Sequence, residues 1–373
     1  MGRKNIRGFN ILTFFSLTAF AFTMSGCSIG YIMQAGYEEA SILLSKKDIN
    51  EILKEEESLE PKLRDTFELV LEAREYAKEI GLTPGGSFTE YASIDRDELV
   101  WVLSAAYQTA LTPYTWWFPV VGWMPYKGFF DKADAIKEAK KFSEKGFDIY
   151  IRPSLAFSTL GWFDDPLLST LTNLDDESLI NTVFHEILHN TVWIKGHVDF
   201  NETLANFVGS KVTEMFFRKK FGDTHPLTQL CIDRLHDEII FADFLNTLIT
   251  KLRAFYTTNE TLSDAEKRKG RDALYAHAIT DWETRKHLLK TNRYQQSISK
   301  LNNAIILGTE LYLKNLSDFN ILYMQSGNSL ELFLRHMKDI AREVEESEKL
   351  PYELLSALIL KSAPSPSQVQ SLQ

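Results

Sequence analysis

The sequence predicts an α+β fold that is mostly α-helical, with a small sheet ahead of a central buried helix and a helical C-terminal part. Three observations carry this prediction. Apolar side chains recur at helical spacing through most of the chain, two short β-branched and aromatic segments lie between residues 99 and 151, and the run 179–195 is apolar enough to be buried. At 373 residues, 44% of them hydrophobic, the chain can form one large core or two modest ones.

Residues 1–26 have the features of a lipoprotein signal peptide. The apolar stretch 11–22 is short for a membrane-spanning helix, and it follows the positive charges of Arg3, Lys4 and Arg7. Met24-Ser25-Gly26 then precedes Cys27, which resembles a lipobox. We therefore expect cleavage before Cys27 and a lipid on that cysteine; the alternative is an ordinary signal peptide with a chance cysteine.

This leader sets expectations for location and charge. Its removal takes away three positive charges, so the net charge of −10 becomes −13. A chain this acidic does not have the charge expected of a nucleic-acid-binding protein. We expect a protein anchored to a membrane of the bacterial cell envelope by the lipid on Cys27, facing the periplasm or the exterior. The only other cysteine is Cys231, so no intrachain disulfide is expected if Cys27 is lipidated.

The N-terminal part should combine helices with a small sheet. Residues 31–44 and 63–80 show helical periodicity. Strands are predicted at 99–103 and 147–151, with a helix at 134–142 between them. A sheet placed ahead of the central helix is suited to holding an extended peptide by strand addition.

An aromatic-rich segment, Trp116 to Phe130, interrupts this part and is predicted to be a loop, since it holds several prolines and glycines. Its aromatic side chains have three interpretations: a buried aromatic mini-core under a long loop, the floor of a substrate pocket, or a surface that faces the membrane. The sequence leaves all three open.

The central helices are predicted at 179–195, with Asp175 or Asp176 as its N-cap and Gly196 closing it, and from Glu202 to Gly222. Further helices are expected at 227–256, 265–291 and 298–316, and a disordered tail at 364–373. We interpret 27–363 as one unit with three parts: a mixed subdomain, 27–165; the central helices, 166–222; and a helical subdomain, 223–363.

The run His185-Glu186-Ile187-Leu188-His189 carries the clearest chemical pattern. On a helix, His185 and His189 lie one turn apart and point the same way, so two imidazoles can bind one metal ion. Glu186 then lies where it can take a proton from a metal-bound water. This is the His-Glu-x-x-His pattern of zinc peptidases, although two histidines on an exposed helix edge would give the same letters.

A third ligand is needed, because catalytic zinc takes three protein groups and leaves one position for water. Glu202 opens the next helix and completes the two-His, one-Glu set of the gluzincins, which predicts a zincin-like fold. Alternatively, Asp199 and Glu202 form a capping box, and His197 or Asp199 is the third ligand. Asn206, one turn after Glu202, could orient a ligand from outside the metal's own shell.

The chain resembles the putative aminopeptidase family of bacterial lipoproteins, from about the lipobox to residue ~340. The resemblance rests on the motif, on Tyr312 and its surroundings, and on four further blocks: Trp116–Pro119, Pro125–Phe130, Ser158–Pro166 and Phe200–Ala205. It implies a metallopeptidase in which Tyr312 donates to the oxyanion of a tetrahedral intermediate, although a tyrosine on an apolar helix is more often core. Cysteines often stand in this family where this chain has Trp117 and Trp123, which implies aromatic packing here in place of a cross-link.

These inferences predict a membrane-anchored zinc peptidase, an aminopeptidase by the resemblance, with one Zn²⁺ ion and peptide or protein substrates. Glu186 is its general base. An aminopeptidase also needs a carboxylate for the substrate ammonium, and the candidates are Asp164, Asp165 and Asp199. Two alternatives stay open: a zinc endopeptidase acting on envelope proteins, and a non-catalytic, metal-containing lipoprotein that binds a partner.

Overall fold

The structure of the protein, a computed structural model, describes residues 42, 44–55, 58–118, 122–154, 164–296 and 298–362. It is α+β and 62% helical with small sheets, which confirms the predicted fold class. The elements, in chain order, are β1 (Lys47–Asp48), α3 (Ile49–Glu55), α4 (Pro61–Glu79), β2 (Glu90–Ala92), β3 (Val100–Tyr107), β4 (Trp116–Phe118), β5 (Gly122–Met124), β6 (Tyr126–Phe129), α5 (Lys132–Glu144), β7 (Phe147–Ser154), β8 (Leu167–Leu168), α6 (Asp176–Thr191), α7 (Val198–Phe221), α8 (Pro226–Thr258), α9 (Asp264–Arg285), a 3₁₀ turn η1 (Lys286–Leu288), α10 (Asn303–Leu313), α11 (Leu316–Gln325), α12 (Leu330–Glu346) and α13 (Pro351–Ser362).

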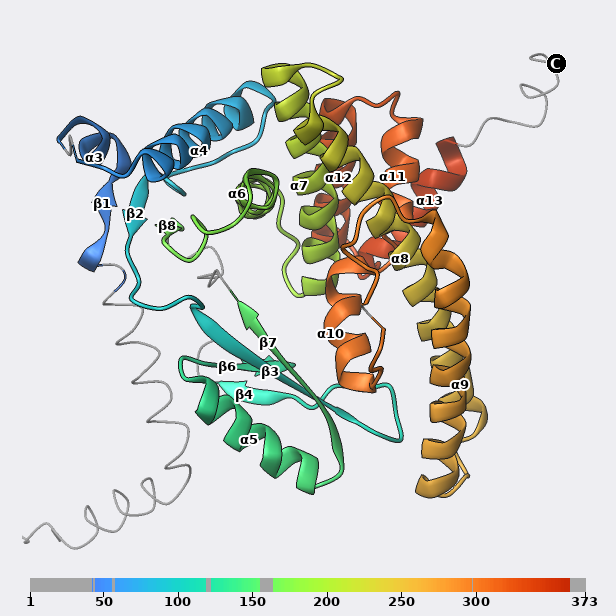
Figure 1. The fold of residues 1–373 in the computed structure, drawn as a ribbon. Coiled ribbons are helices and arrows are strands. Elements are labelled where there is room, and N and C mark those ends of the chain that lie inside the picture. The colour runs from blue at the N-terminus through green and yellow to red at the C-terminus, as the bar shows by residue number, and fades with distance from the viewer. Residues whose placement is uncertain are drawn as a thin grey trace, which may run out of the picture.

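The main sheet has the order β6-β3-β7 and is antiparallel throughout. Its long strands are the two predicted from the sequence, and β3 pairs with β7 along all eight residues of each. Helix α5 packs on one side of this sheet and α10 on the other (Figure 1). A second sheet, β1-β2-β8, lies under α3 and α4 and joins the sheet region to the helices.

The aromatic segment was predicted to be a loop, but part of its backbone forms β-strands, so that prediction was wrong. β4 and β5 form a hairpin in which Trp117 and Trp123 are direct partners, and both side chains are more than half exposed. The prolines and glycines that suggested a loop lie at or between these short strands, where they do not interrupt a ladder. Trp116 instead joins a partly buried ring cluster with Tyr114, Phe142 and Phe147. Trp116 thus packs inward, whereas Trp117 and Trp123 lie at the surface.

Helix α10 is held against the sheet by two adjacent asparagines. The side chain of Asn302 accepts from Ile305 N as N-cap and donates to the carbonyl of Ile149 on β7 at 3.0 Å. Asn303, fully buried, donates to the carbonyl of Tyr107 at the end of β3. Further along α10, a Cβ on Gly308 would lie 3.1 Å from the ring of Tyr150, so glycine lets the helix come close to β7.

Helices α6 and α7 form the centre of the molecule. α6 packs against α4 on one side and α7 on the other, and fourteen of the 24 residues of α7 are buried (Figure 1). A Cβ on Gly209 of α7 would lie 3.1 Å from the carbonyl oxygen of Asn181 and 3.3 Å from the amide nitrogen of His185. The two backbones therefore approach closely where the motif of α6 lies.

The start of α6 is fixed by charges. Asp175 is its N-cap, accepting from Ser178 N at 3.0 Å, as one of the two predicted alternatives had it. Arg234 from α8 pairs with Asp175 and also with Glu177, which is 2% exposed. Both carboxylates lie at the positive end of the helix dipole, so α6 begins at a favourable place for negative charge.

The C-terminal helices α8 to α13 cover α7 from the side away from α4 (Figure 1). Two predicted helices are shorter than expected: the one at 265–291 ends at Arg285 and η1, and the one at 298–316 begins only at Asn303. In both places the difference is at an end, where periodicity is weakest as a guide. Most of the buried apolar residues, from Ile49 to Leu355, form one cluster; a smaller set at the main sheet and α5, including Leu103, Ala139 and Phe142, lies outside it.

Within the described ranges, no helix is both long and apolar enough to span a membrane. The predicted leader 1–26, the lipidated Cys27, most of the helix 31–44 and the tail 364–373 lie outside the described residues.

Cys231 on α8 gives a test of this packing. It is 2% exposed, and burial raises the pKa of its thiol to about 12. In full-length protein in detergent with Cys27→Ser, we expect a thiol-specific disulfide reagent at pH 8 to react with Cys231 at least about 100-fold more slowly than after unfolding in guanidinium. A Ser356→Cys variant, exposed on α13, should react at once. Rapid labelling of the folded protein at Cys231 would contradict the packing of α8.

Candidate metal centre

Three side chains predicted as metal ligands converge in the structure. His185 Nε2 and His189 Nε2 are 3.2 Å apart. Glu202 reaches both from α7, with its Oε2 3.4 Å from His185 Nε2 and its Oε1 3.6 Å from His189 Nε2. Within the described part of the chain, these three residues form the group of histidines, cysteines and carboxylates whose ligand atoms lie within 4.8 Å of one another.

The spacing and chemistry of this group fit a metal ion. Ligand atoms placed about 2.1 Å from a common centre at tetrahedral angles lie about 3.4 Å from one another. The three observed separations cluster around that value. Two imidazole nitrogens and one carboxylate are also a donor set that suits a divalent transition metal and leaves a fourth position open.

Local structure explains why these groups meet. His185 and His189 are one turn apart near the end of α6, and Glu202 is in the second turn of α7, on the side that faces α6. Gly209 lies two turns further along α7 at the close contact with the backbone of His185. A larger residue there would move Glu202 away from the histidines.

The structure does not bring His197 or Asp199 to the two histidines, and it does not form the capping box. His197 is the N-cap of α7 without a side-chain capping bond, so no capping box exists there. Asp199 pairs with Lys314 of α10 at 2.6 Å, and neither His197 nor Asp199 belongs to the group of converging ligand atoms. The carboxylate of Glu202 is thus engaged by histidines and not by backbone N–H groups.

The electrostatics of the three groups are coupled. Burial lowers the pKa of His185, but the carboxylates of Glu202 and Glu186 outweigh this effect and the net shift is upward. Burial lowers the pKa of His189 to about 4, with repulsion from His185 adding to it. Burial raises the pKa of Glu202, yet its bond to His185 outweighs burial and the pKa falls. His189 is therefore neutral and Glu202 ionised near pH 7, the forms in which both bind metals.

Glu186 lies beside this group in a buried position. Burial raises the pKa of its carboxyl to about 7; His185 opposes the shift, and the negative charge of Asp165 adds to it. A carboxyl group that titrates near neutral pH is suited to accepting and returning a proton.

Tyr312 lies beside His185. Its ring centroid is 6.4 Å from that of His185, and its hydroxyl accepts from Arg152 Nη2 of β7 at 3.3 Å. Burial raises the pKa of Tyr312, and the charge of Glu202 adds to the shift, so the hydroxyl keeps its proton at neutral pH. The residue that helical periodicity alone would assign to the core is therefore at the candidate centre.

Two asparagines of α7 position the surroundings of the centre. Asn206, predicted to orient a ligand, donates from Nδ2 to the carbonyl of Tyr312 at 3.1 Å, so its contact is with the end of α10. Asn201 was not singled out from the sequence. Its buried amide accepts from Ile194 N at 2.9 Å and donates to Ile194 O at 2.8 Å.

These two hydrogen bonds of Asn201 explain where α6 ends. The helix was predicted to run to Lys195 and closes at Thr191, with Val192 already extended. Because Asn201 takes up both main-chain groups of Ile194, the connection between His189 and Glu202 leaves the helix early and is held rigidly. Asn201 stands among polar residues, between Asp199 and Thr203, so the local sequence contained no signal for this role.

The three carboxylates proposed for a substrate ammonium have different surroundings. Asp164 accepts from the amide of Gly86 at 2.9 Å and lies against that glycine. Asp199 is paired with Lys314. Asp165 is the one that influences the pKa of Glu186. Of the three, Asp165 is therefore the carboxylate with an electrostatic effect on the candidate general base.

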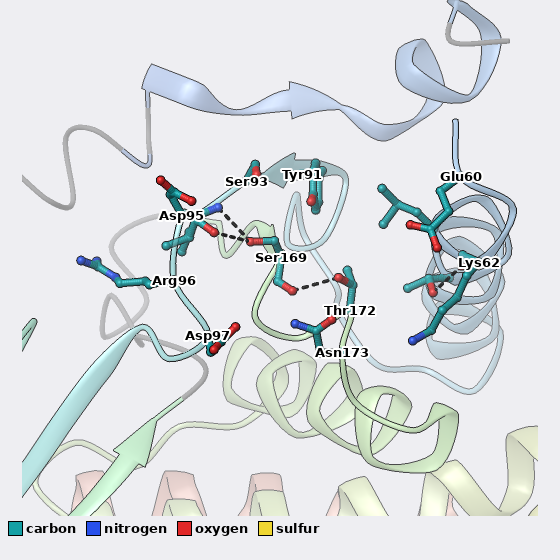
Figure 2. Close-up of a pocket in the computed structure, with 13 residues that line it drawn as sticks. Glu60, Lys62, Tyr91, Ser93, Asp95, Arg96, Asp97, Ser169, Thr172 and Asn173 are labelled. Carbon is teal, nitrogen blue, oxygen red and sulfur yellow. Dashed lines mark hydrogen bonds between the residues drawn. The ribbon is translucent and has the colours of Figure 1, made fainter. Parts of the chain in front are cut away.

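Two cavities differ in their relation to the centre. A cavity of about 180 Å³ lies between the sheet and α10, and Arg152 is part of its wall. A larger one, about 580 Å³, is formed by α4, the loop before β3 and the turn before α6, and Figure 2 shows its polar lining. There the hydroxyl of Ser169 bonds both main-chain groups of Ile94. No residue of the metal group lines the larger cavity.

Comparison with known proteins gives one finding. Residues 30–350 match the model of a family described as "Putative aminopeptidase". Neither the proteins of curated function nor the solved structures contain a match to this chain.

The role of Asn201 leads to a prediction. Asn201→Ala removes two buried hydrogen bonds and leaves two main-chain groups of Ile194 unpaired, so we expect the free energy of unfolding to fall by about 2–4 kcal/mol. Urea unfolding of the full chain followed by circular dichroism measures this. The matched variant Asn292→Ala, at an exposed position, should change it by less than about 0.5 kcal/mol. Equal effects of the two substitutions would contradict the role given to Asn201.

Proposed function

The chain belongs to the Putative aminopeptidase family, and on that premise we propose that it is a zinc-dependent aminopeptidase with a zincin-like active site. The convergence of His185, His189 and Glu202 from two tightly packed helices is the observation that carries the proposal. The family match supports peptidase activity, and the two-His, one-carboxylate donor set supports zinc.

The proposed metal ligands are His185, His189 and Glu202, each through the atom that faces the other two. Zinc held there would supply a Lewis acid that polarises the scissile carbonyl and acidifies a water molecule. Glu186 follows His185 directly in α6, and its carboxylate takes the proton of the attacking water. It then returns this proton to the amine that leaves, so the proton balance closes on one residue.

Tyr312 is proposed to stabilise the negative oxygen that develops on the substrate carbonyl. Because Arg152 donates to the oxygen of Tyr312, the hydroxyl proton of the tyrosine is left to point elsewhere, and the ring's position beside His185 aims it at the centre. Asn206 holds the main chain of Tyr312, so its contribution is to position that residue.

An aminopeptidase must also bind the substrate's N-terminal ammonium. We assign this to Asp165, because it is the one of the three candidates whose negative charge acts on the general base Glu186. Asp165 precedes β8 in the chain. The ammonium would thus be fixed next to the scissile bond, which limits cleavage to the first residue.

The proposed location in the cell is supported by the sequence of the N-terminal segment. The leader 1–26 and the lipobox at Cys27 support a lipid-anchored enzyme of the bacterial envelope, facing the periplasm or exterior. The three-part division of residues 27–363 stays part of this proposal, with the central helices providing the metal ligands.

Glu186→Gln tests the mechanism. The substitution keeps the shape of the side chain but cannot accept the proton, so we expect kcat to fall by about 10²–10⁴ on peptides with a free N-terminus, while zinc stays near one ion per chain. Turnover of such peptides and metal content by mass spectrometry are the measurements. Glu68→Gln, exposed on α4, is the matched control and should keep the wild-type rate.

The other outcomes separate the alternative functions. Wild-type cleavage of N-blocked peptides would move the assignment to an endopeptidase. Zinc in both proteins without cleavage of any peptide by either would favour a partner-binding lipoprotein. A purified protein with no zinc near stoichiometry would contradict the metal.

Asp165→Asn tests the ammonium site. Loss of the negative charge should raise KM for free N-terminal peptides by about 10- to 100-fold, since a charge-assisted bond is replaced by a neutral one. The variant Asp272→Asn, on the exposed side of α9, controls for net charge. If KM is unchanged in Asp165→Asn, the ammonium is bound elsewhere.

A further inference from the structure

The small cavity between the main sheet and α10 is lined by several charged side chains. Its wall includes two acids and three bases, from β7, α7, α8, α10 and the residue that follows α10: Asp199, Glu310, Arg152, Arg253 and Lys314. The cavity holds about 180 Å³, room for a small group and not for a folded segment. It adjoins the candidate metal centre through Arg152 and Tyr312.

Four of these five charges form pairs. Asp199 binds Lys314 at 2.6 Å, and Glu310, 6% exposed, receives two bonds from Arg253 at 2.8 and 3.0 Å. Arg152 has no carboxylate within ion-pair distance among the residues that the structure describes; its polar contact is the hydroxyl of Tyr312. The cavity therefore carries one positive charge that its own acids leave uncompensated.

The guanidinium of Arg152 is held in place from two sides. Its carbon lies 5.6 Å from the ring centre of Tyr312, and one of its five N–H groups is used by the tyrosine hydroxyl. On the strand, Tyr150 and Arg152 project from the same face toward α10, where Gly308 admits the ring of Tyr150. A fixed planar guanidinium with unused donors is the preferred partner of a carboxylate, which it binds through two parallel bonds.

We propose that Arg152 and this cavity form a subsite for a carboxylate of the peptide substrate. The inference rests on the proposed function, since it takes the scissile bond to lie at the metal group. The contacts from His185 to Tyr312, 6.4 Å between ring centroids, and from Tyr312 to Arg152, 5.6 Å, then place the carboxylate within about three residues of that bond. The carboxylate is either the α-carboxylate of a very short peptide or the side chain of an acidic residue; both present the same chemistry to Arg152.

This subsite would set specificity and would leave the chemical step to other residues. Asp165 acts on Glu186 and Arg152 contacts Tyr312, so the site has both an acidic and a basic group, and a zwitterionic short peptide matches both charges. The enzyme would then favour substrates that carry a negative group near the cleaved bond over otherwise identical neutral ones.

The test uses the full chain in detergent, loaded with zinc, and two matched peptide pairs. Ala-Ala against Ala-Ala-amide reports an α-carboxylate, and Ala-Glu-amide against Ala-Gln-amide reports an acidic side chain. We expect wild type to favour the carboxylate member of one pair in kcat/KM by about 10- to 100-fold, and Arg152→Met to abolish that ratio. Arg152→Lys should keep part of it, and Arg335→Met, an exposed arginine on α12, should keep all of it.

A readout without turnover separates this inference from the peptidase assignment. Calorimetry with the Glu186→Gln protein, with and without Arg152→Met, measures binding of the same peptides. Carboxylate-selective binding without cleavage by wild type would support the subsite and contradict the peptidase. Cleavage by wild type without a carboxylate preference would support the peptidase and contradict the subsite, whatever the variants do.

Two results with Arg152→Met would overturn the inference even if the variant folds normally. An equal loss of kcat/KM on both members of each pair would assign Arg152 to the positioning of Tyr312. Loss of zinc would assign it to the support of Glu202, whose pKa it helps to lower.

Discussion

The close packing of α6 against α7 is the interaction on which the rest of the structure depends. It brings a partly buried carboxylate to two partly buried histidines, a combination that is costly unless the groups satisfy one another. A glycine at the contact and a buried asparagine at the turn between the helices make this possible, while α4, α8 and α10 enclose the pair. The ion pairs of Arg234 fix where α6 begins, and Asn201 fixes where it ends. The position of the motif along α6 is therefore determined by contacts at both ends of the helix.

Groups of both charges surround this pair. Glu186, a carboxyl that titrates near neutrality, is affected by the charge of a second carboxylate, Asp165. Tyr312, a protonated phenol, accepts a hydrogen bond from a cation, Arg152. Charges of both signs beside one centre are suited to a dipolar ligand, because each of its ends finds an opposite charge.

Periodicity and residue spacing in the sequence were enough to predict the features that depend on local structure. The motif helix, the choice of Glu202 and the two long strands followed from local patterns, and the fold class from their order. What it did not predict depends on contacts between distant segments. Arg152 reads as an ordinary strand residue until the pairing of β7 brings it to α10, and the short strands within 116–130 form from a stretch rich in turn residues. The early end of α6 depends on Asn201, a residue of the next helix.

Helix α10 begins about 80 residues after the end of α7, and it is attached to the sheet by asparagines at its first turn. The three converging ligand atoms come from two consecutive helices, whereas Tyr312 reaches them through the packing of α10 on a distant sheet. In the proposed enzyme, metal binding would therefore depend on one local helix pair, and the oxyanion donor would depend on a separate contact between distant segments. Damage to the sheet would then remove the donor and spare the metal.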